Sequence, residues 1–458
     1  MANECDDAPK GTSTEIKALS ERLGLLRSVR RAYFGVRHRG LLLLTYMWRR
    51  LMLRTTVIAI TGSVGKTTAK ECLAAILSAH ATTIKTLHNR NDEFGVPPTL
   101  RAIRPWHRFA VIEIGTATPG LVARSARLVK PDIAIVLGVA RTHTNVFPTL
   151  EDTAAEKAQL LAHLSRRGLA ILNGDDALVR RMAERSPARN VFFGQSQDYD
   201  VVAENVRSSW PERLRFDIRS GAESLPVQTQ LVGTHWAPSV LAALTAAEAC
   251  GVPLATAIRT VGDVAPFTAR MQPVTLPQGA VLIRDEQNGS PDTLNAMLKV
   301  LRESNARRRV VVIGDVSDSK ANPKKRQREI GRLAAELCEF AVFFSDHGHH
   351  AKRAAVTAGM DPMSCHAISD LKSAAELLKR ELRSGDLVFL KSRGTDHASR
   401  ILFAQFGDIG CWKSSCNIRS VCDLCNQLKP TFDVDQTLSQ ARNDEAADAC
   451  KALHSSSG

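Results

Sequence analysis

One segment near residue 60 has the residue types and spacing of a phosphate-binding loop. It reads Thr61-Gly62-Ser63-Val64-Gly65-Lys66-Thr67-Thr68 and lies between a β-branched run and a stretch of helical composition. Glycines let backbone N–H groups face a phosphate, and the N-terminus of the following helix adds its positive end. Lys66 can reach the β- and γ-phosphates, while the hydroxyl of Thr67 can bind Mg²⁺. We therefore predict that this segment binds ATP with Mg²⁺. The alternative is a tight glycine turn with a surface lysine.

A cluster of cysteines near the C-terminus has residue types that can hold a metal ion. Four thiols within 15 residues, separated by four, five and two residues, can surround Zn²⁺ tetrahedrally. A short tail without a core of its own would gain folding free energy from such an ion. An iron–sulfur cluster and uncoordinated thiols are the alternatives. The cysteines of this cluster are Cys411, Cys416, Cys422 and Cys425.

Apolar runs that alternate with helical stretches indicate the elements that would position these sites. A first series of predicted strands covers residues 56–60, 110–114, 133–137 and 170–172, with helical stretches at 69–77 and 235–252. A second series covers residues 280–283, 310–313, 341–344 and 387–390. Apolar strands separated by helices are typical of parallel sheets covered on both faces. We predict an α/β protein with a doubly wound, P-loop central ATPase domain and a smaller Rossmann-like domain. The expected divisions are a basic extension at 1–54, a central domain at 55–268, a C-terminal domain at 269–408 and a cysteine-rich tail at 409–458.

The bulk composition is that of a globular protein with an excess of positive charge. The 458 residues carry a formal net charge of +14, and 44% of them are hydrophobic. Such a charge favours acidic partners such as nucleotides or anionic lipid, and we expect no specific nucleic-acid binding. No run approaches the roughly 18 apolar residues of a membrane span. The acidic N-terminus lacks the basic start of a secretory signal, so we expect a cytoplasmic protein.

Residues 27–54 differ from the rest of the chain. They contain eight arginines and no acidic residue, interleaved with leucine and aromatic side chains. One interpretation is a basic amphipathic helix that lies on anionic lipid or on a partner, which would make the protein membrane-associated. The other is a helical extension that packs on the body with its arginines in water. Gly35 and Gly40 are expected to interrupt a single continuous helix.

Beyond the phosphate loop, several segments follow one another as they do in the Mur ligases, and most closely as in the MurF branch of that family. The resemblance covers about residues 56–405, and its strength lies in the common order of motifs that are individually weak. Besides 61–68, these are Asn89–Pro97, Glu113–Gly115, Ala140–His143, Ala155–Ala158, Leu172–Asp176, Gly233–His235, Arg270, Asp285–Asp292, Gly314–Asp315 and Lys391–Gly394.

The resemblance implies an ATP-dependent ligase that joins a carboxylate to an amine. ATP would first convert the carboxylate into an acyl phosphate, and the amine would then displace phosphate. Because negatively charged groups must meet, metal ions and lysine are needed to neutralise them. Thr67 and Glu113 match the ligands of one Mg²⁺ in the family, and His143 matches a ligand of a second.

Lys157 matches a lysine that is carbamylated in the family. A carbamate would supply the oxygen ligands that Mg²⁺ prefers, and burial would make the neutral amine available for the reaction with CO₂. Thr149 and Asp152 have the spacing of a capping box at the start of the helix that carries Lys157. The implied catalytic residues are Lys66, His143 and Lys157, and the implied nucleotide contacts beyond the loop are His235, Arg270 and Asp285.

The sequence departs from the MurF pattern at positions that concern the substrates. MurF enzymes have a domain ahead of the ATP loop that recognises UDP, and we expect it to be absent here, where a basic segment of about 54 residues stands instead. Trp236 and Ser239 occupy a stretch that usually carries asparagines, and Gln159 stands where an acid is common. We therefore expect a divergent member that acts on another small-molecule, glycan or peptide carboxylate and an amine. The alternatives are a UDP-N-acetylmuramoyl-tripeptide–D-alanyl-D-alanine ligase of peptidoglycan synthesis and a non-catalytic, nucleotide-binding Mur-like protein.

Overall fold

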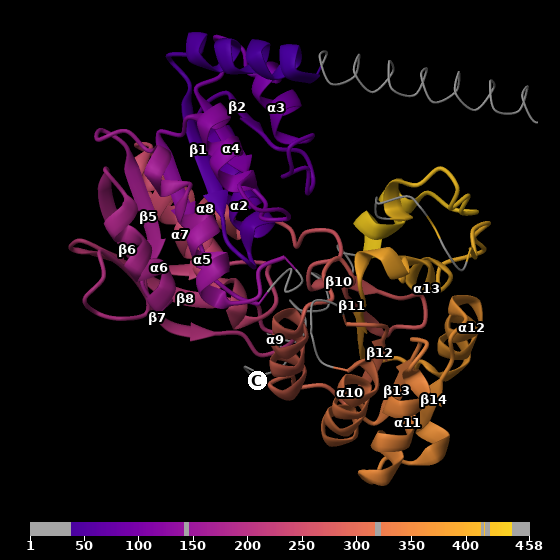
Figure 1. Cartoon of the computed structure of the whole chain (residues 1–458). Coiled ribbons are helices and arrows are strands. Elements are labelled where there is room, and N and C mark those ends of the chain that lie inside the picture. Colours follow the sequence, from indigo (N-terminus) through magenta and orange to yellow (C-terminus); the bar gives the residue numbers. More distant parts are fainter. Residues whose placement is uncertain (1–37, 142–145, 317–321, 414–415, 417–421, 442–458) are drawn as a thin grey trace, which may run out of the picture.

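The computed structural model describes residues 38–141, 146–316, 322–413, 416 and 422–441. These residues form two β-sheets, each covered by helices, and the chain builds them one after the other (Figure 1). The predicted α/β class with a large and a small unit is confirmed, because both sheets are mainly parallel.

The larger sheet has nine strands in the order β2-β3-β1-β4-β5-β6-β7-β8-β9. Neighbours pair in parallel from β2 to β7, whereas β7–β8 and β8–β9 pair antiparallel. The four predicted strands correspond to β1, β3, β4 and β5, and sequence analysis missed β2 and β6 to β9. The bounds are β1 Thr56–Thr61, β2 Thr83–Lys85, β3 Phe109–Glu113, β4 Ile133–Val136, β5 Leu169–Asn173, β6 Arg189–Gly194, β7 Val201–Arg207, β8 Arg215–Ser220 and β9 Glu223–Gln228.

Helix α7 is the central helix of the larger unit. Its sequence is rich in alanine, and ten of its residues are buried, so it can pack closely against both α2 and strands β4 to β7. The helices are α2 Lys66–His80, α3 Val96–Ala102, α4 Leu121–Val129, α5 Leu150–Ala158, α6 Ala177–Met182, α7 Ala237–Ala249 and α8 Leu254–Gly262, with 3₁₀ turns η1 Leu161–His163, η2 Ala183–Arg185 and η3 Thr234–Trp236.

The smaller sheet has the strand order β10-β11-β15-β12-β13-β14, and only β10 runs antiparallel to its neighbour. The side chains of Ser290, Asn322 and Asp370 cap the N-termini of three of its helices. The strands are β10 Gln272–Thr275, β11 Val281–Asp285, β12 Arg308–Ile313, β13 Phe340–Phe343, β14 Cys365–Ala367 and β15 Asp386–Lys391. The helices are α9 Pro291–Arg302, α10 Pro323–Leu337, α11 Gly348–Thr357, α12 Leu371–Glu381 and α13 Ser399–Phe403, with 3₁₀ turns η4 Pro362–Ser364, η5 Gly394–Asp396 and η6 Cys422–Leu424.

The described part of the tail packs onto this smaller unit (Figure 1). Ile409, Leu428 and Leu438 are buried in the same apolar cluster as strands β12 and β15 and helix α13. The described regular elements of the tail are η6 and a helix over residues 434–441, which carries Leu438. The tail therefore depends on contacts with the body rather than on a core of its own.

A helix over residues 38–51 precedes β1 and packs on the larger sheet's unit. Our expectation that Gly40 would interrupt a helix was wrong, because packing of the helix offsets the cost of about 1 kcal/mol for a helical glycine, and Gly35 lies outside the described residues. Arg49 is buried and donates to the carbonyls of Val129 at 2.8 Å and Lys130 at 2.9 Å, and Trp48 Nε1 donates to the carbonyl of Ile103 at 3.0 Å. The helix thus buries an arginine, and it leaves Leu43, Met47 and Leu51 more than half exposed. No helix in the described part of the chain is long and apolar enough to cross a membrane.

Candidate nucleotide and metal site

The phosphate loop lies at the carboxyl end of β1, between β3 and β4. The chain moves from β1 to β2 and β3 on one side of the sheet and then to β4 on the other, so this is the position where the strand order reverses. Such switch points are where open α/β sheets bind ligands. The strand–loop–helix arrangement predicted for 61–68 is present, with β1 ending at Thr61 and α2 beginning at Lys66.

The turn into α2 requires a glycine. Gly65 has a φ of 85°, in the left-handed region, and a Cβ at this position would lie 2.4 Å from Ser239 Oγ. Ser239 also donates a hydrogen bond to the Gly65 carbonyl at 3.2 Å. Ser239, at a position that departs from the MurF pattern, therefore links α7 to the phosphate loop, a role that sequence analysis missed.

Lys66 lies over the phosphate loop. Its Nζ donates to the carbonyl oxygens of Gly62 at 2.7 Å and Ser63 at 3.2 Å. Burial lowers the pKa of Lys66, with Arg270 acting in the same direction, while Glu113 opposes the shift. The lysine is therefore held where a phosphate bound by the loop would meet it.

Thr67 and Glu113 provide a pair of oxygen ligands beside the loop. Glu113 ends β3, which pairs directly with β1, and its carboxylate oxygens accept from Thr67 Oγ1 at 3.3 and 3.1 Å. Asn91 Nδ2 donates to the same carboxylate at 2.7 Å, and Lys70 Nζ lies 3.5 Å from it. A hydroxyl and a carboxylate on fixed backbone fit the preference of Mg²⁺ for hard oxygen ligands. Lys70 and Asn91 were not predicted as site residues, since nothing in the local sequence indicates that they face Glu113.

Lys157 is fully buried on α5, and its Nζ donates to Thr116 Oγ1 at 2.7 Å. Burial lowers the pKa of Lys157 well below its usual range, and the positive charge of Lys66 lowers it further. The predicted capping box is confirmed, because Thr149 and Asp152 exchange side-chain and backbone hydrogen bonds at the start of α5. The environment favours a neutral amine, which is the form that can react with CO₂. His143 lies outside the described residues, so its position relative to Lys157 stays a prediction.

The smaller unit presents charged groups at the carboxyl ends of its own strands. Asp285 and Lys391 are register partners on β11 and β15, and their side chains form a buried ion pair. Burial lowers the pKa of Arg270, whereas the charges of Glu113 and Asp285 raise it. Arg270 is therefore within electrostatic range of carboxylates from both units.

His235, in η3 of the larger unit, is close to charged groups of the smaller unit. Burial lowers its pKa to about 3, and Lys391 and Lys299 contribute to the shift. The ring is therefore neutral near pH 7 and can serve as a hydrogen-bonding or stacking group rather than a cation. The predicted residues Lys66, Arg270 and Asp285 thus come from two units and interact through their charges, while the neutral ring of His235 lies within the influence of Lys391.

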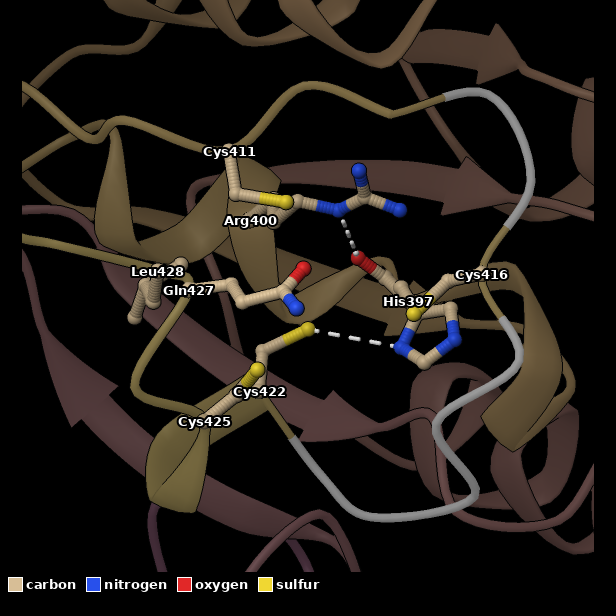
Figure 2. Close-up of a pocket in the computed structure, with 8 residues that line it drawn as sticks. All are labelled: His397, Arg400, Cys411, Cys416, Cys422, Cys425, Gln427 and Leu428. Carbon is tan, nitrogen blue, oxygen red and sulfur yellow. Dashed lines mark hydrogen bonds between the residues drawn. The ribbon is translucent and has the colours of Figure 1, made fainter.

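The four predicted cysteines belong to the tail, beside helix α13 of the smaller unit. Cys411, Cys416, Cys422 and Cys425 line one pocket together with His397 and Arg400 (Figure 2). Within the described residues, no group of three or more His, Cys, Asp or Glu side chains already has the arrangement of a metal site. A metal ion would therefore have to draw these thiols closer together.

Comparison with known proteins relates both units to one family. The profile of the Mur ligase middle domain matches residues 60–247, and that of the Mur ligase glutamate ligase domain matches residues 269–394. The UDP-N-acetylmuramoyl-tripeptide–D-alanyl-D-alanine ligase of Synechocystis is 30% identical over 338 residues, which cover 73% of this chain and 71% of that protein. A crystal structure of MurF from Acinetobacter baumannii superposes with a TM-score of 0.74 and 25% identity, over 80% of each chain.

The enzyme of the same name from Escherichia coli is 29% identical over 289 residues, or 63% of this chain. This chain covers 64% of the length of that protein.

Replacement of Gly65 by alanine should destabilise the protein more than the same change at Gly251. The two glycines have nearly equal φ values, 85° and 86°, but only Gly65 would bring a Cβ against another atom within 4 Å. Each alanine would cost about 1–2 kcal/mol for the left-handed backbone. Gly65→Ala should lose additional free energy of unfolding, measured in urea, and Ser239→Ala in the same chain should recover that addition. Equal losses in Gly65→Ala and Gly251→Ala would show that Ser239 does not confine the loop.

Proposed function

Because the chain belongs to the Mur ligase family, we propose that it is an ATP-dependent ligase that joins a carboxylate to an amine. The observation that carries this proposal is the convergence of a phosphate loop, the Thr67–Glu113 oxygen pair and the buried Lys157, with Arg270 of the second unit close enough to Glu113 to interact with its charge. A scaffold protein would have little need for this combination of groups. The domain divisions at residues 54, 268 and 408 remain part of the proposal.

In the proposed reaction, a carboxylate oxygen attacks the γ-phosphorus of ATP, and ADP leaves with the bridging oxygen. The amine then attacks the acyl carbon, phosphate leaves with the former carboxylate oxygen, and the nitrogen releases a proton. Lys66 would leave the loop carbonyls to contact the β- and γ-phosphates. Mg²⁺, held by Thr67 and Glu113, would neutralise the phosphates when bound.

The substrates are a carboxylate on a small molecule, glycan or peptide, and an amine. The names of the relatives favour one specific pair as the alternative, a UDP-N-acetylmuramoyl tripeptide and D-alanyl-D-alanine. An assay of product formation with that pair separates the two. Product formed from it would assign the peptidoglycan activity, and product formed only from other acids and amines would assign a divergent ligase.

Lys66→Ala should remove the proposed activity. Loss of a single preorganised group that stabilises transition-state charge costs about 10²–10³ in turnover. We expect phosphate release that depends on both an acid and an amine to fall by at least about 100-fold. Lys379→Ala, on the exposed face of α12, should leave it unchanged. Wild-type protein that releases no phosphate with any acid and amine pool, or full activity in Lys66→Ala, would refute the ligase.

Lys157 should be carbamylated and needed for turnover. Its neutral amine can take up CO₂, and the carbamate anion would replace a cation that repels Mg²⁺. With ¹³C-labelled bicarbonate, the wild type should show a carbamate NMR signal that Lys157→Met lacks. Methionine keeps the buried apolar stem, so ATP affinity should stay within about twofold while turnover falls by at least about tenfold.

A small carboxylic acid added to Lys157→Ala should restore part of the lost turnover. Full activity of either variant at ordinary Mg²⁺ concentration would contradict a metal-binding role for Lys157.

We also propose that the helix over residues 38–51 contacts an anionic membrane surface. The apolar side chains of Leu43, Met47 and Leu51 point away from the body and are more than half exposed. Exposed Arg39 and Arg54 flank them. Such a face can lie at the boundary of headgroups and acyl chains.

Leu51→Glu should release the protein from vesicles that contain phosphatidylglycerol. Removal of one leucine from the interface costs about 1.5–3 kcal/mol, or roughly a tenfold loss of affinity or more. Cosedimentation measures this loss, and Met363→Glu is the matched control, because Met363 is 78% exposed outside the helix. Equal binding of wild type and Leu51→Glu would exclude the helix as the contact.

A second candidate site is the cysteine pocket, for which we propose bound Zn²⁺. The supporting observation is that the four predicted cysteines line a single pocket although they are spread over 15 residues. Elemental analysis of protein purified without added metal should find about one zinc per chain.

A further inference from the structure

The pocket of four cysteines contains a fifth residue that sequence analysis did not associate with it. His397 Nδ1 lies 3.4 Å from Cys422 Sγ (Figure 2). The other ring nitrogen, Nε2, is buried and has no hydrogen-bond partner in the described structure. The residue has a φ of 55°, in the left-handed region that histidine adopts more often than most residues other than glycine. In this conformation the fold holds the ring against a sulfur.

Arg400 gives the pocket a positive charge. Its Nη1 donates to the carbonyl of Lys413 at 2.7 Å and its Nε to that of His397 at 3.2 Å, so the side chain is fixed beside the sulfurs. Four thiolates around one Zn²⁺ have a net charge of −2. A guanidinium at the rim and an imidazole N–H on one sulfur would stabilise such a group in a buried site.

Asp423, between two of the cysteines in η6, extends from the pocket into the interior of the smaller unit. Its two carboxylate oxygens accept hydrogen bonds from Arg284 Nη1 at 2.7 Å and Nη2 at 3.0 Å. Arg284 is fully buried, and its other partners are Glu286 and Ser399. Arg284 is thus held between two carboxylates, and the tail supplies one of them. The tail is therefore part of the charge balance of the core.

Arg284 connects this network to the proposed ligase site. It is the neighbour of Asp285 on β11, and successive side chains of a strand point to opposite faces of the sheet. On its own face, Asp285 pairs with Lys391 and accepts from the backbone N–H of Met271 at 3.3 Å. One strand thus carries the tail contact on one face and a candidate site residue on the other.

Between residues 409 and 433, the described part of the tail has only the turn η6 as regular structure to hold Asp423 in place. The three-residue η6 is bounded by Cys422 and lies next to Cys425, so both ends of this turn would be fixed by a metal ion bound to these thiols. Structural zinc sites supply the folding free energy of segments that cannot form a core.

Resting on the ligase and zinc proposals above, we propose that the zinc site is a clamp that positions the ligase site. Cys411, Cys416, Cys422 and Cys425 bind Zn²⁺ as thiolates and release their protons, and His397 donates from Nδ1 to the sulfur of Cys422. The ion fixes η6, so that Asp423 completes the ion pair of Arg284 and holds β11, with Asp285, in register against Lys391. Asp423 and Arg284 are positioning residues, since they act through Asp285.

Two variants of the full chain distinguish the loss of zinc from the loss of the contact between Asp423 and Arg284. Cys425→Ser should reduce the zinc content to less than half an ion per chain and increase hydrogen exchange at the β11 amides. Asp423→Asn should increase the same exchange while zinc stays at about one per chain. Both should lower turnover by at least about tenfold with ATP affinity within about twofold. In the double variant the losses of turnover should not add, because both changes break one connection.

Cys250→Ser, in a cysteine distant from the pocket, should retain zinc, β11 protection and turnover. Where a variant fails to fold, removal of zinc from the wild type with a chelator and its addition back should raise and then restore the exchange of β11. Normal β11 protection and turnover in Asp423→Asn would overturn the clamp. Wild-type protein with no zinc, or with the visible absorbance of an iron–sulfur cluster, would overturn the zinc site. Failure of the ligase proposal would give a different result: the wild type would be inactive. The two substitutions would still change zinc content and β11 hydrogen exchange as described.

Discussion

The structure depends on the compensation of positive charge in its interior. Lys70, Lys157, Arg284 and Lys391 are all fully buried, and an unpaired cation in such a place is costly. Three of them lie beside carboxylates: Lys70 beside Glu113, Lys391 beside Asp285, and Arg284 between Glu286 and Asp423. Lys157 differs, because its hydrogen bond goes to the hydroxyl of Thr116. Its surroundings therefore favour the neutral amine, and the family resemblance offers a chemical use for that amine.

The same constraint explains how two separate sheets contribute to one candidate site. Parallel strands end at one edge, so Glu113 on β3 comes next to the loop after β1, and Asp285 on β11 comes next to Lys391 on β15. Arg270 stands between the carboxylates of both units and interacts with each through its charge. Lys66 and Arg270 can thus meet the negative charges of a ligand with several phosphates, and Glu113 can hold the metal ion that such a ligand carries.

Sequence analysis predicted the elements whose residues are buried on both faces, because a continuous apolar run is a local signal. Among the strands that it missed are β7 and β8, in which polar residues such as Glu204 and Arg219 lie near apolar ones toward the edge of the sheet. The phosphate loop could be predicted because its chemistry is contained in eight consecutive residues. Contacts such as Lys70 with Glu113, Ser239 with Gly65, and Arg284 with Asp423 span from 43 to 174 positions of the chain. No local pattern encodes them, and the helix through Gly40 shows that tertiary packing can override intrinsic propensity.

The bonds from Lys66 to the carbonyls of Gly62 and Ser63 also have a kinetic consequence. In this conformation the carbonyls of Gly62 and Ser63 compete with the phosphates of a nucleotide for the ammonium group of Lys66. The apparent affinity for a nucleotide is reduced by the fraction of molecules in which the lysine is so engaged. After the reaction, return of the lysine to these carbonyls would compete with the bound product for the same charge. These hydrogen bonds would therefore lower the affinity of the loop for the product nucleotide and promote its release.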